Sequence, residues 1–575
     1  MAAPLVRLET FVPAARRRRP ACAALAVVLG LALVACTGGE PSAGPGTPTP
    51  TVDPGPQPDD VVATAVIPEG GVDLEVRVHP LVRTGEHVVL TLDLVPLEDI
   101  DDTVHVHGFG VTSFVAEGKA PVNVRLFDLA ADVVHHVGAG ADGKPVVAPE
   151  KWGRIRHAHG TRLQMPFAAP ADDVQALSLL VPGAPLFVDV PIIDGELPPA
   201  AHPDDVAAAA DAAATATAEA SASPSATPEE VEPAEELDLD AVVRAPTFPL
   251  ESTSAELHGA VRTIESTERV EVTLGSDVLF AFDSADLTPE SAQAVTLVAE
   301  RLAEREQGTV EVVGHTDDQA DDAYNRDLSQ RRAQAVADAL AAQVGASGHR
   351  MKVDGRGEAE PVADNTSEEG RALNRRVTVS LTSKVVTRTD VTTVGELPEF
   401  GAHVGTAGTP LRVETYNRTW EVDATARRVH GHVVVDVTVH AADDERGLGS
   451  APGFLRGFSS HRPGKSASPH GITARGTVLQ GASRLFPLDY RVGENESWPD
   501  GEWFTASDLD ASSWIDGGQT RTFSFVYPRL DVDTVVFQAG TGVAFDTDFR
   551  LVDVPVAPEV AATPTPSAAT DDATP

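Results

Sequence analysis

The chain has 575 residues, a hydrophobic content of 42% and a formal net charge of −42. This length predicts about three or four domains, and the hydrophobic content is sufficient for folded cores. The negative charge excludes a typical nucleic-acid-binding protein, which needs a basic surface. It also excludes bulk attraction to anionic lipid or wall polymers, so such partners must be recognised by specific local contacts.

Residues 1–35 have the pattern of a bacterial signal peptide. Arg16 to Arg19 precede an apolar stretch over residues 21–35, which is too short to span a bilayer comfortably as a helix. The stretch ends in Leu-Val-Ala-Cys, which resembles a lipobox, so we expect cleavage before a lipidated Cys36 and membrane anchoring through its acyl chains. The alternative is an ordinary secretory signal with a chance cysteine. Because Cys22 lies inside the signal, no internal disulfide is expected in the mature chain.

Three low-complexity segments divide the remainder. They are rich in Gly, Pro, Ala, Thr, Ser or acidic residues and too polar to build a core. We interpret them as disordered: a tether at residues 36–60, a linker at 198–245 and a tail at 557–575.

Residues 61–197 are predicted to form a β-sandwich of the Ig-like kind. Residues 72–78 and 87–94 alternate apolar and polar side chains, as half-buried strands do. Many short strands separated by turn signals, without helical periodicity, favour an antiparallel sandwich.

Residues 385–556 have the same strand-rich pattern and contain short sequence matches to the first region. Gly-Glu-His-Val-Val at 85–89 resembles Gly-His-Val-Val-Val at 431–435; Arg-Leu-Phe recurs at 125–127 and 484–486; and Val-Asp-Val-Pro recurs at 188–191 and 552–555. The three matches occur in one order, with spacing that increases steadily. We therefore predict a second β-sandwich that duplicates the first.

Three histidine pairs have the i, i+2 spacing that places two side chains on one strand face. They are His105 with His107, His157 with His159, and His430 with His432. Since no Cys, Met or carboxylate at ligand spacing accompanies them, we interpret them as strand histidines and predict no metal site and no cofactor.

The pattern changes to mixed α and β between the two sandwiches, in a domain assigned to residues 246–384. We predict strands at 278–282, 309–313, 351–354 and 377–381, with helices after Pro289 and over 328–340, giving the order βαβαββ. Asp317 follows the second strand, and Arg332 lies on the buried face of the second helix. A carboxylate and a guanidinium across this corner suit a small zwitterionic ligand, although an internal ion pair is the simpler alternative.

A family resemblance favours the ligand. The domain contains FDSA at 282–285, GHTD at 314–317, Asn325, Leu328-Ser329, Arg332-Ala333, a Gly-Arg-Gly-Glu turn at 355–358, Pro-Val-Ala at 361–363 and NRRV at 374–377. This set, in this order, resembles the C-terminal domain of OmpA-like proteins, including Pal-type lipoproteins and the periplasmic part of MotB.

The resemblance implies non-covalent peptidoglycan binding through the diaminopimelate residue of the stem peptide. By motif position, Asp317 takes the ligand ammonium and Arg332 its carboxylate. Thr316 and Asn325 shape the pocket, and Asp283 flanks it. Arg375 is expected to contribute because it shares strand parity with Val377, whereas Arg376 faces away.

One position departs from the family, which usually has glycine where this chain has Ala320. If that glycine has a positive φ, alanine is strained there.

We therefore predict a cell-envelope lipoprotein that links a membrane to peptidoglycan, anchored either on the outer face of the cytoplasmic membrane or in an outer membrane. Two attachment points in one chain raise the effective concentration of each. In the alternative, the sandwiches bind a protein partner or act as adhesins, and the central domain only localises them. No nucleophile elbow, HExxH or Cys-His pairing is present, so no enzyme activity is predicted.

Overall fold

The computed structural model describes residues 55–98, 100, 103–107, 109–110, 123–149, 154–155, 160–200, 236–257, 261–345, 348–386, 397–415, 418–445, 451–456, 475–493, 501–510, 514–540 and 547–559. The predicted signal peptide, Cys36, His157 and His159 lie outside these residues, as does nearly all of the predicted tail. Within the described ranges, no helix has the length and apolar character needed to cross a bilayer.

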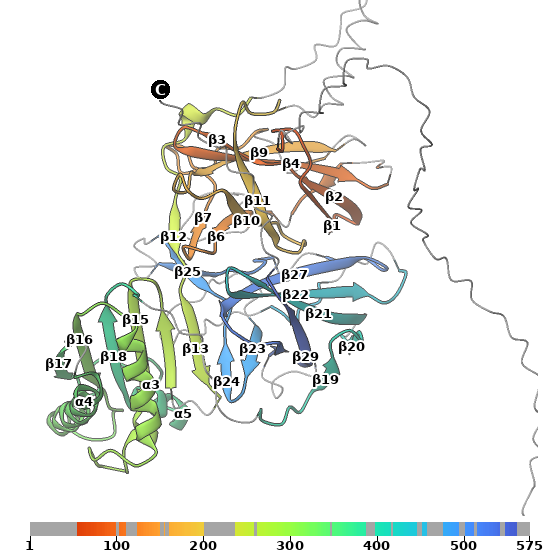
Figure 1. The fold of residues 1–575 in the computed structure, drawn as a ribbon. Helices are drawn as coiled ribbons and strands as arrows, with labels where there is room; N and C mark the ends of the chain where they lie inside the picture. Colours follow the sequence, from red (N-terminus) through yellow and green to blue (C-terminus); the bar gives the residue numbers. More distant parts are fainter. Residues whose placement is uncertain are drawn as a thin grey trace, which may run out of the picture. The chain divides into compact units, whose positions relative to one another are not determined.

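The central domain combines strands and helices (Figure 1). Its elements are β14 (Val261–Glu265), β15 (Arg269–Gly275), α2 (Ser276–Leu279), α3 (Ser291–Ala303), β16 (Thr309–Gly314), α4 (Asp322–Val344), β17 (Arg350–Gly355), α5 (Glu368–Asn374) and β18 (Arg376–Thr382). The strands lie in the order β17-β16-β18-β15-β14, and only β16 and β17 are parallel.

The core lies between one face of this sheet and the two long helices. The strands alternate, so that Val272, Val312 and Val379 are buried while their neighbours along each strand, such as Glu271, Val313 and Thr378, are less buried. Val298 of α3 and Val336 of α4 pack in the same cluster. The domain is thus a two-layer α+β structure.

One predicted strand is wrong. The apolar run at 278–282 is the end of α2 and a turn, not a strand. The strand that precedes α2 in the sheet is β15, seven residues long, which pairs with β18 from Gly275 to Arg269. The other three predicted strands and both long helices are confirmed, and the short α5 was not predicted.

Two glycines let α4 approach the sheet at the end that carries the pocket described below. Gly314 and Gly355 end the parallel strands β16 and β17 and are register partners. A Cβ on Gly314 would lie 2.1 Å from the backbone oxygen of Ser329, and one on Gly355 would lie 2.4 Å from the nitrogen of Gln330. Any side chain here must therefore push the helix away.

We predict that Gly314→Ala lowers the stability of the central domain by about 2 kcal/mol or more, because overpacking against a backbone is not relieved by side-chain movement. The described α-helices all lie in this domain, so its thermal unfolding can be followed by the helical circular dichroism signal. Gln343→Ala, on the exposed face of α4, is the control. Equal melting of Gly314→Ala and the control would contradict the close approach.

The region before the central domain is rich in strands. They are β1 (Ala63–Glu69), β2 (Val72–Val78), β3 (Leu81–Thr84), β4 (His87–Pro96), β5 (Val104–His105), β6 (Arg125–Asp128), β7 (Val133–His135), β8 (Arg154–Ile155), β9 (Thr161–Ala168), β10 (Ala176–Leu180), β11 (Phe187–Asp194), followed by η1 (Leu239–Ala241) and β12 (Thr247–Pro249). The predicted strands at 72–78 and 87–94 are confirmed.

The region after it is equally strand-rich. Its strands are β19 (His403–Thr406), β20 (Leu411–Glu414), β21 (Thr419–Val429), β22 (His432–Ala441), β23 (Gly476–Gln480), β24 (Ser483–Leu485), β25 (Asp489–Val492), β26 (Glu502–Thr505), β27 (Thr520–Arg529), β28 (Thr534–Ala539) and β29 (Phe549–Ala557). Both regions have the large sheets expected of β domains, while their sandwich packing stays a prediction.

The two β regions share unusual backbone features. Strands β10 and β11 pair with a register shift between Leu177 and Leu179, and β28 and β29 pair with a shift between Val535 and Phe537. The aspartates of the two Val-Asp-Val-Pro segments, Asp189 and Asp553, both have a left-handed φ, 53° and 55°. A non-glycine residue rarely adopts this conformation. Its recurrence at both positions supports the predicted duplication.

One of the three sequence matches is wrong. Arg125 lies in β6, which pairs directly with β10. Arg484 lies in β24, which is separated from β28 by β23. The two Arg-Leu-Phe segments therefore occupy different places in their sheets, and the match is a chance recurrence of a short strand sequence.

Two predicted boundaries also need correction. Residues 236–245, assigned to the disordered linker, contain η1 and a bridge from Arg244 to Ala139. Residues 247–256, assigned to the central domain, are shared with the flanking regions: β12 pairs with β7, and β13 (Ser252–Glu256) pairs with β24 on one side and with β14 of the central domain on the other. This single segment thus adds a strand to both β regions before the chain enters the central sheet.

Candidate functional site

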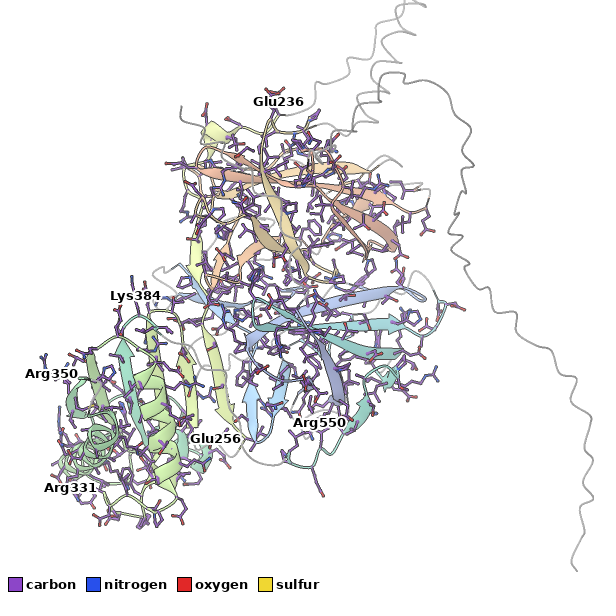
Figure 2. The ribbon with its side chains drawn as sticks, in the orientation of Figure 1. Glu236, Glu256, Arg331, Arg350, Lys384 and Arg550 are labelled. Carbon is purple, nitrogen blue, oxygen red and sulfur yellow. The ribbon has the colours of Figure 1, made fainter. Side chains whose placement is uncertain are left out.

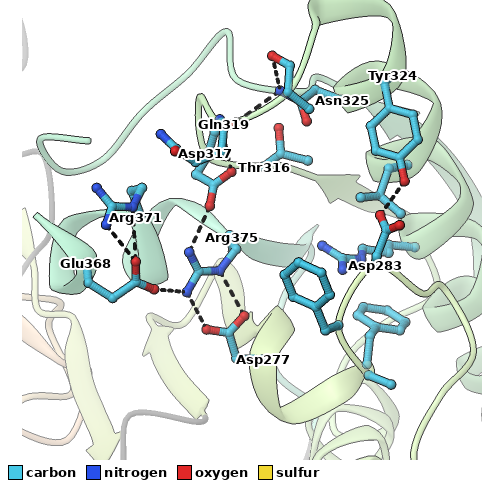
Figure 3. Close-up of a pocket in the computed structure, with 16 residues that line it drawn as sticks. Asp277, Asp283, Thr316, Asp317, Gln319, Tyr324, Asn325, Glu368, Arg371 and Arg375 are labelled. Atoms are coloured by element: carbon cyan, nitrogen blue, oxygen red, sulfur yellow. Dashed lines mark hydrogen bonds and ion pairs between the residues drawn. The ribbon is translucent and has the colours of Figure 1, made fainter. Parts of the chain in front are cut away.

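A cavity of about 600 Å³ lies in the central domain, within the usual range for small-ligand sites. It is lined by the turn after α2, the loop after β16, the first half of α4 and one face of α5 (Figure 3). All six binding residues predicted from sequence line it, namely Asp283, Thr316, Asp317, Asn325, Arg332 and Arg375. The predicted residues are therefore brought together.

Arg332 is the buried cation of the cavity. Its side chain comes from α4, is only 6% exposed and lies with its guanidinium carbon 5.2 Å from the centre of the Phe280 ring. Its Nε donates to the backbone oxygen of Ser284 at 2.9 Å. No carboxylate among the described residues forms an ion pair with it. Burial lowers the pKa of Arg332 from its usual value, although nearby aspartates partly oppose this effect.

Arg375 holds a cluster of carboxylates from separate elements. It donates to both oxygens of Asp277 at 2.9 and 2.7 Å, to Asp317 at 2.8 Å and to Glu368 at 2.7 Å (Figure 3). The hydrogen bonds to Asp277 contribute most to raising the pKa of Arg375. Its donors are thus used inside the protein, so Arg375 positions Asp317 and does not offer a free fork to a ligand.

The reason given for choosing Arg375 over Arg376 was wrong, although the choice itself agrees with the cavity lining. Arg375 is the C-cap of α5 and precedes β18, so strand parity does not apply to it. Arg376 begins β18 and is buried, with Nη2 donating to the Glu360 oxygen at 3.1 Å. Burial lowers the pKa of Arg376 to about 10.

Asn325 and Thr316 have different roles in the loop that carries Asp317. The Asn325 amide nitrogen donates to Glu358 at 2.6 Å and to the backbone oxygens of Asp317 and Ala320 at 3.2 and 3.4 Å. Asn325 therefore anchors the backbone of this loop to the first turn of α4. The Thr316 hydroxyl is buried and has no hydrogen-bond partner in the described structure, which leaves it available to a ligand that enters the cavity.

Ala320 is compatible with this loop. It is not among the residues with a positive φ, so alanine is not strained at this position. The residue of the site that does have a left-handed backbone is Asp283, with φ 59°. Asp283 accepts a hydrogen bond from the Tyr324 hydroxyl at the mouth of the cavity (Figure 3).

Several lining residues were missed by the sequence reasoning, including Asp277, Tyr324, Glu368 and Arg371. Glu368, Arg371 and Arg375 recur at i, i+3 and i+7, which places them on one helical face. That periodicity was the available signal, and it was overlooked because residues 368–374 were not predicted to be a helix.

The histidine pairs have structural contacts. His432 is buried and lies 2.9 Å from an Asp132 oxygen and 3.0 Å from the backbone oxygen of Tyr527, while the His105 and His107 rings stack at 5.7 Å. The described residues contain no group of three or more side chains suited to hold a metal ion.

We predict that Arg375→Ala destabilises the central domain by about 2 kcal/mol, because it removes charge-assisted hydrogen bonds and leaves Asp277 and Asp317 without the cation that pairs with both, whereas Glu368 keeps Arg371. Adding Asp277→Asn to that variant should recover part of the loss by removing one of the repelling charges. Hydrogen exchange of amides in α4 and β16 measures both effects.

Arg331→Ala is the control for that experiment, since Arg331 lies at the surface of the central domain (Figure 2) and forms an ion pair with the exposed Asp327 on the same helix. Such a pair contributes about 0.5 kcal/mol or less. If Asp277→Asn worsens the Arg375→Ala variant, charge repulsion is not the cause of its instability.

The matches to known proteins fall on this domain. The OmpA family matches residues 279–375. Outer membrane porin F of Pseudomonas aeruginosa is 44% identical over 101 residues, which are 18% of this chain and 29% of the porin. YfiB of Escherichia coli, named as a lipoprotein, is 38% identical over 110 residues, which are 19% of this chain and 69% of YfiB.

A solved structure described as the cell wall anchor of the T6SS from Pseudomonas aeruginosa is 40% identical, covers 22% of this chain and 89% of its own, and has a TM-score of 0.20. The curated relatives differ in how much of them is matched: the chain spans less than a third of porin F and about half of the E. coli lipoprotein YiaD. The two β regions lie outside the matched family segment.

Proposed function

The chain belongs to the OmpA family, and we propose that it is a cell-envelope protein whose central domain binds peptidoglycan non-covalently. The ligand group is the diaminopimelate residue of the stem peptide, held in the cavity between α4, α5 and the loop after β16. The names of its relatives, which include lipoproteins and a cell wall anchor, support an envelope location.

The unneutralised guanidinium of Arg332 is the observation that carries this proposal. A buried cation without an anionic partner is costly, and the protein retains it at the floor of an open cavity. A ligand carboxylate would supply the missing partner in the planar, two-point geometry that arginine favours. The observation argues against the simpler alternative, in which Arg332 pairs with Asp317, because Asp317 pairs with Arg375.

The acidic side of the cavity supplies the groups that would bind the ammonium of a zwitterionic ligand. Asp317 and Asp283 come from different loops and both line the cavity that contains Arg332. Arg375 neutralises part of the charge around Asp317, while Asp283 accepts a hydrogen bond from the neutral phenol of Tyr324. The ligand's ammonium would bind on this side while its carboxylate reaches Arg332. The free end of the diaminopimelate side chain carries both of these groups.

Attachment to a membrane completes the proposed role. A lipid on Cys36 and a wall contact in one chain would hold the wall close to the membrane even if each stem peptide binds weakly, because the second contact is intramolecular. We propose no catalytic activity. The alternative role, in which the β regions bind a protein partner, is favoured only by their repeated backbone features and their size.

The test is retention of residues 37–575 on isolated peptidoglycan sacculi. We expect Arg332→Ala and Asp317→Ala each to weaken retention tenfold or more, since each removes one partner of a desolvated ion pair with the ligand. Arg331→Ala, one position away on the exposed face of α4, should bind as the unaltered chain does. Circular dichroism of each variant separates lost binding from lost folding. Equal retention of all four folded proteins would disprove the site.

A further inference from the structure

Phe282 is an aromatic side chain that the fold leaves in solvent. It lines the rim of the cavity and is fully exposed, whereas Phe280, two residues earlier, is 3% exposed and lies beneath Arg332. Large apolar side chains are usually buried. A completely exposed phenylalanine at the edge of a ligand cavity offers its whole ring to a ligand that occupies the cavity.

The backbone around Phe282 is held in place. The Phe280 backbone bridges to Leu287, the Ser284 nitrogen donates to the Ala281 oxygen at 3.1 Å, and the Ser284 oxygen accepts from Arg332. Asp283 occupies a left-handed conformation inside this turn. The turn that displays Phe282 is thus the same one that positions an acid of the cavity and holds its buried arginine.

A second aromatic ring lies nearby on the rim. Tyr324, at the start of α4, is 38% exposed and donates its hydroxyl to Asp283. This hydrogen bond raises the pKa of Tyr324. The mouth of the cavity therefore combines a free apolar ring, an anchored phenol and a carboxylate. Such a surface suits a ligand with both a C–H face and hydroxyl groups.

We propose that Phe282 binds a sugar ring of the glycan strand, so that the domain recognises a muropeptide and not only its diamino acid. This inference rests on the proposed function, because the stem peptide must first be held by the cavity. The stem residues that adjoin the diamino acid, alanine and glutamate, carry apolar groups much smaller than a phenyl ring. A sugar ring is the part of the ligand with a C–H face large enough to cover it.

The test uses residues 37–575 and three ligands: free diaminopimelate, the sugar-free stem tripeptide, and the same tripeptide carrying its disaccharide. Calorimetric titration should show that the disaccharide raises the affinity of the unaltered chain about tenfold, as expected for one covered aromatic face. Phe282→Ala should remove this gain and leave the affinity for the tripeptide unchanged. Phe282→Tyr keeps the ring and should keep the gain.

Leu373→Ala removes an exposed apolar side chain of α5 that does not line the cavity, and is the matched control. The inference is overturned if Phe282→Ala leaves the disaccharide gain intact, or if it weakens tripeptide and muropeptide equally, which would indicate a peptide contact. If the unaltered chain binds none of the three ligands, or if Arg332→Ala binds all of them normally, the proposed function fails as well.

Discussion

The central domain is built to keep one guanidinium buried and unpaired. Arg332 is fixed by its position on α4 and by two contacts from the turn after α2, the Phe280 ring under it and the Ser284 oxygen. The glycines at the ends of β16 and β17 let α4 lie close enough to the sheet for this arrangement. The turn after α2, the loop after β16 and α5 then surround the arginine with acids that are anchored elsewhere.

Anchoring those acids is the role of Arg375. Without it, Asp277 and Asp317 would be two like charges near one cavity without the cation that now pairs with them, while Glu368 would keep its ion pair with Arg371. By satisfying them, Arg375 keeps Arg332 available. The two arginines therefore have different roles: Arg375 positions acidic side chains of the protein, and Arg332 is available to the ligand.

Much of this could be predicted from sequence where a pattern is local. The periodicity of α3 and α4 and the alternation of β2 and β4 were sufficient to place those elements. The run at 278–282 misled because its apolar residues serve a short helix and a turn, in which Phe280 is buried and Phe282 is not. Hydrophobic content alone does not distinguish these environments.

The remaining errors concern tertiary relations. The hydrogen-bond donors of Arg375 are occupied by residues that lie far away along the chain. Asp277 is 98 positions away and Asp317 is 58 positions away, and no local sequence pattern shows that these residues meet. The Arg-Leu-Phe match failed for a similar reason, because three residues do not specify which strand of a sheet they occupy. The assignment of residues 247–256 to the central domain missed their other partners, because β7 and β24 lie far from this segment along the chain.

The most direct test of the central claim is to remove the negative charge of the ligand group that contacts Arg332 and to measure the affinity. Calorimetry would compare the stem tripeptide whose free side-chain carboxylate is ionised with the same peptide amidated at that carboxylate. The account predicts a loss of thirtyfold or more on amidation, because a neutral amide leaves the buried guanidinium without its counter-charge. Equal affinity for the two peptides would contradict it.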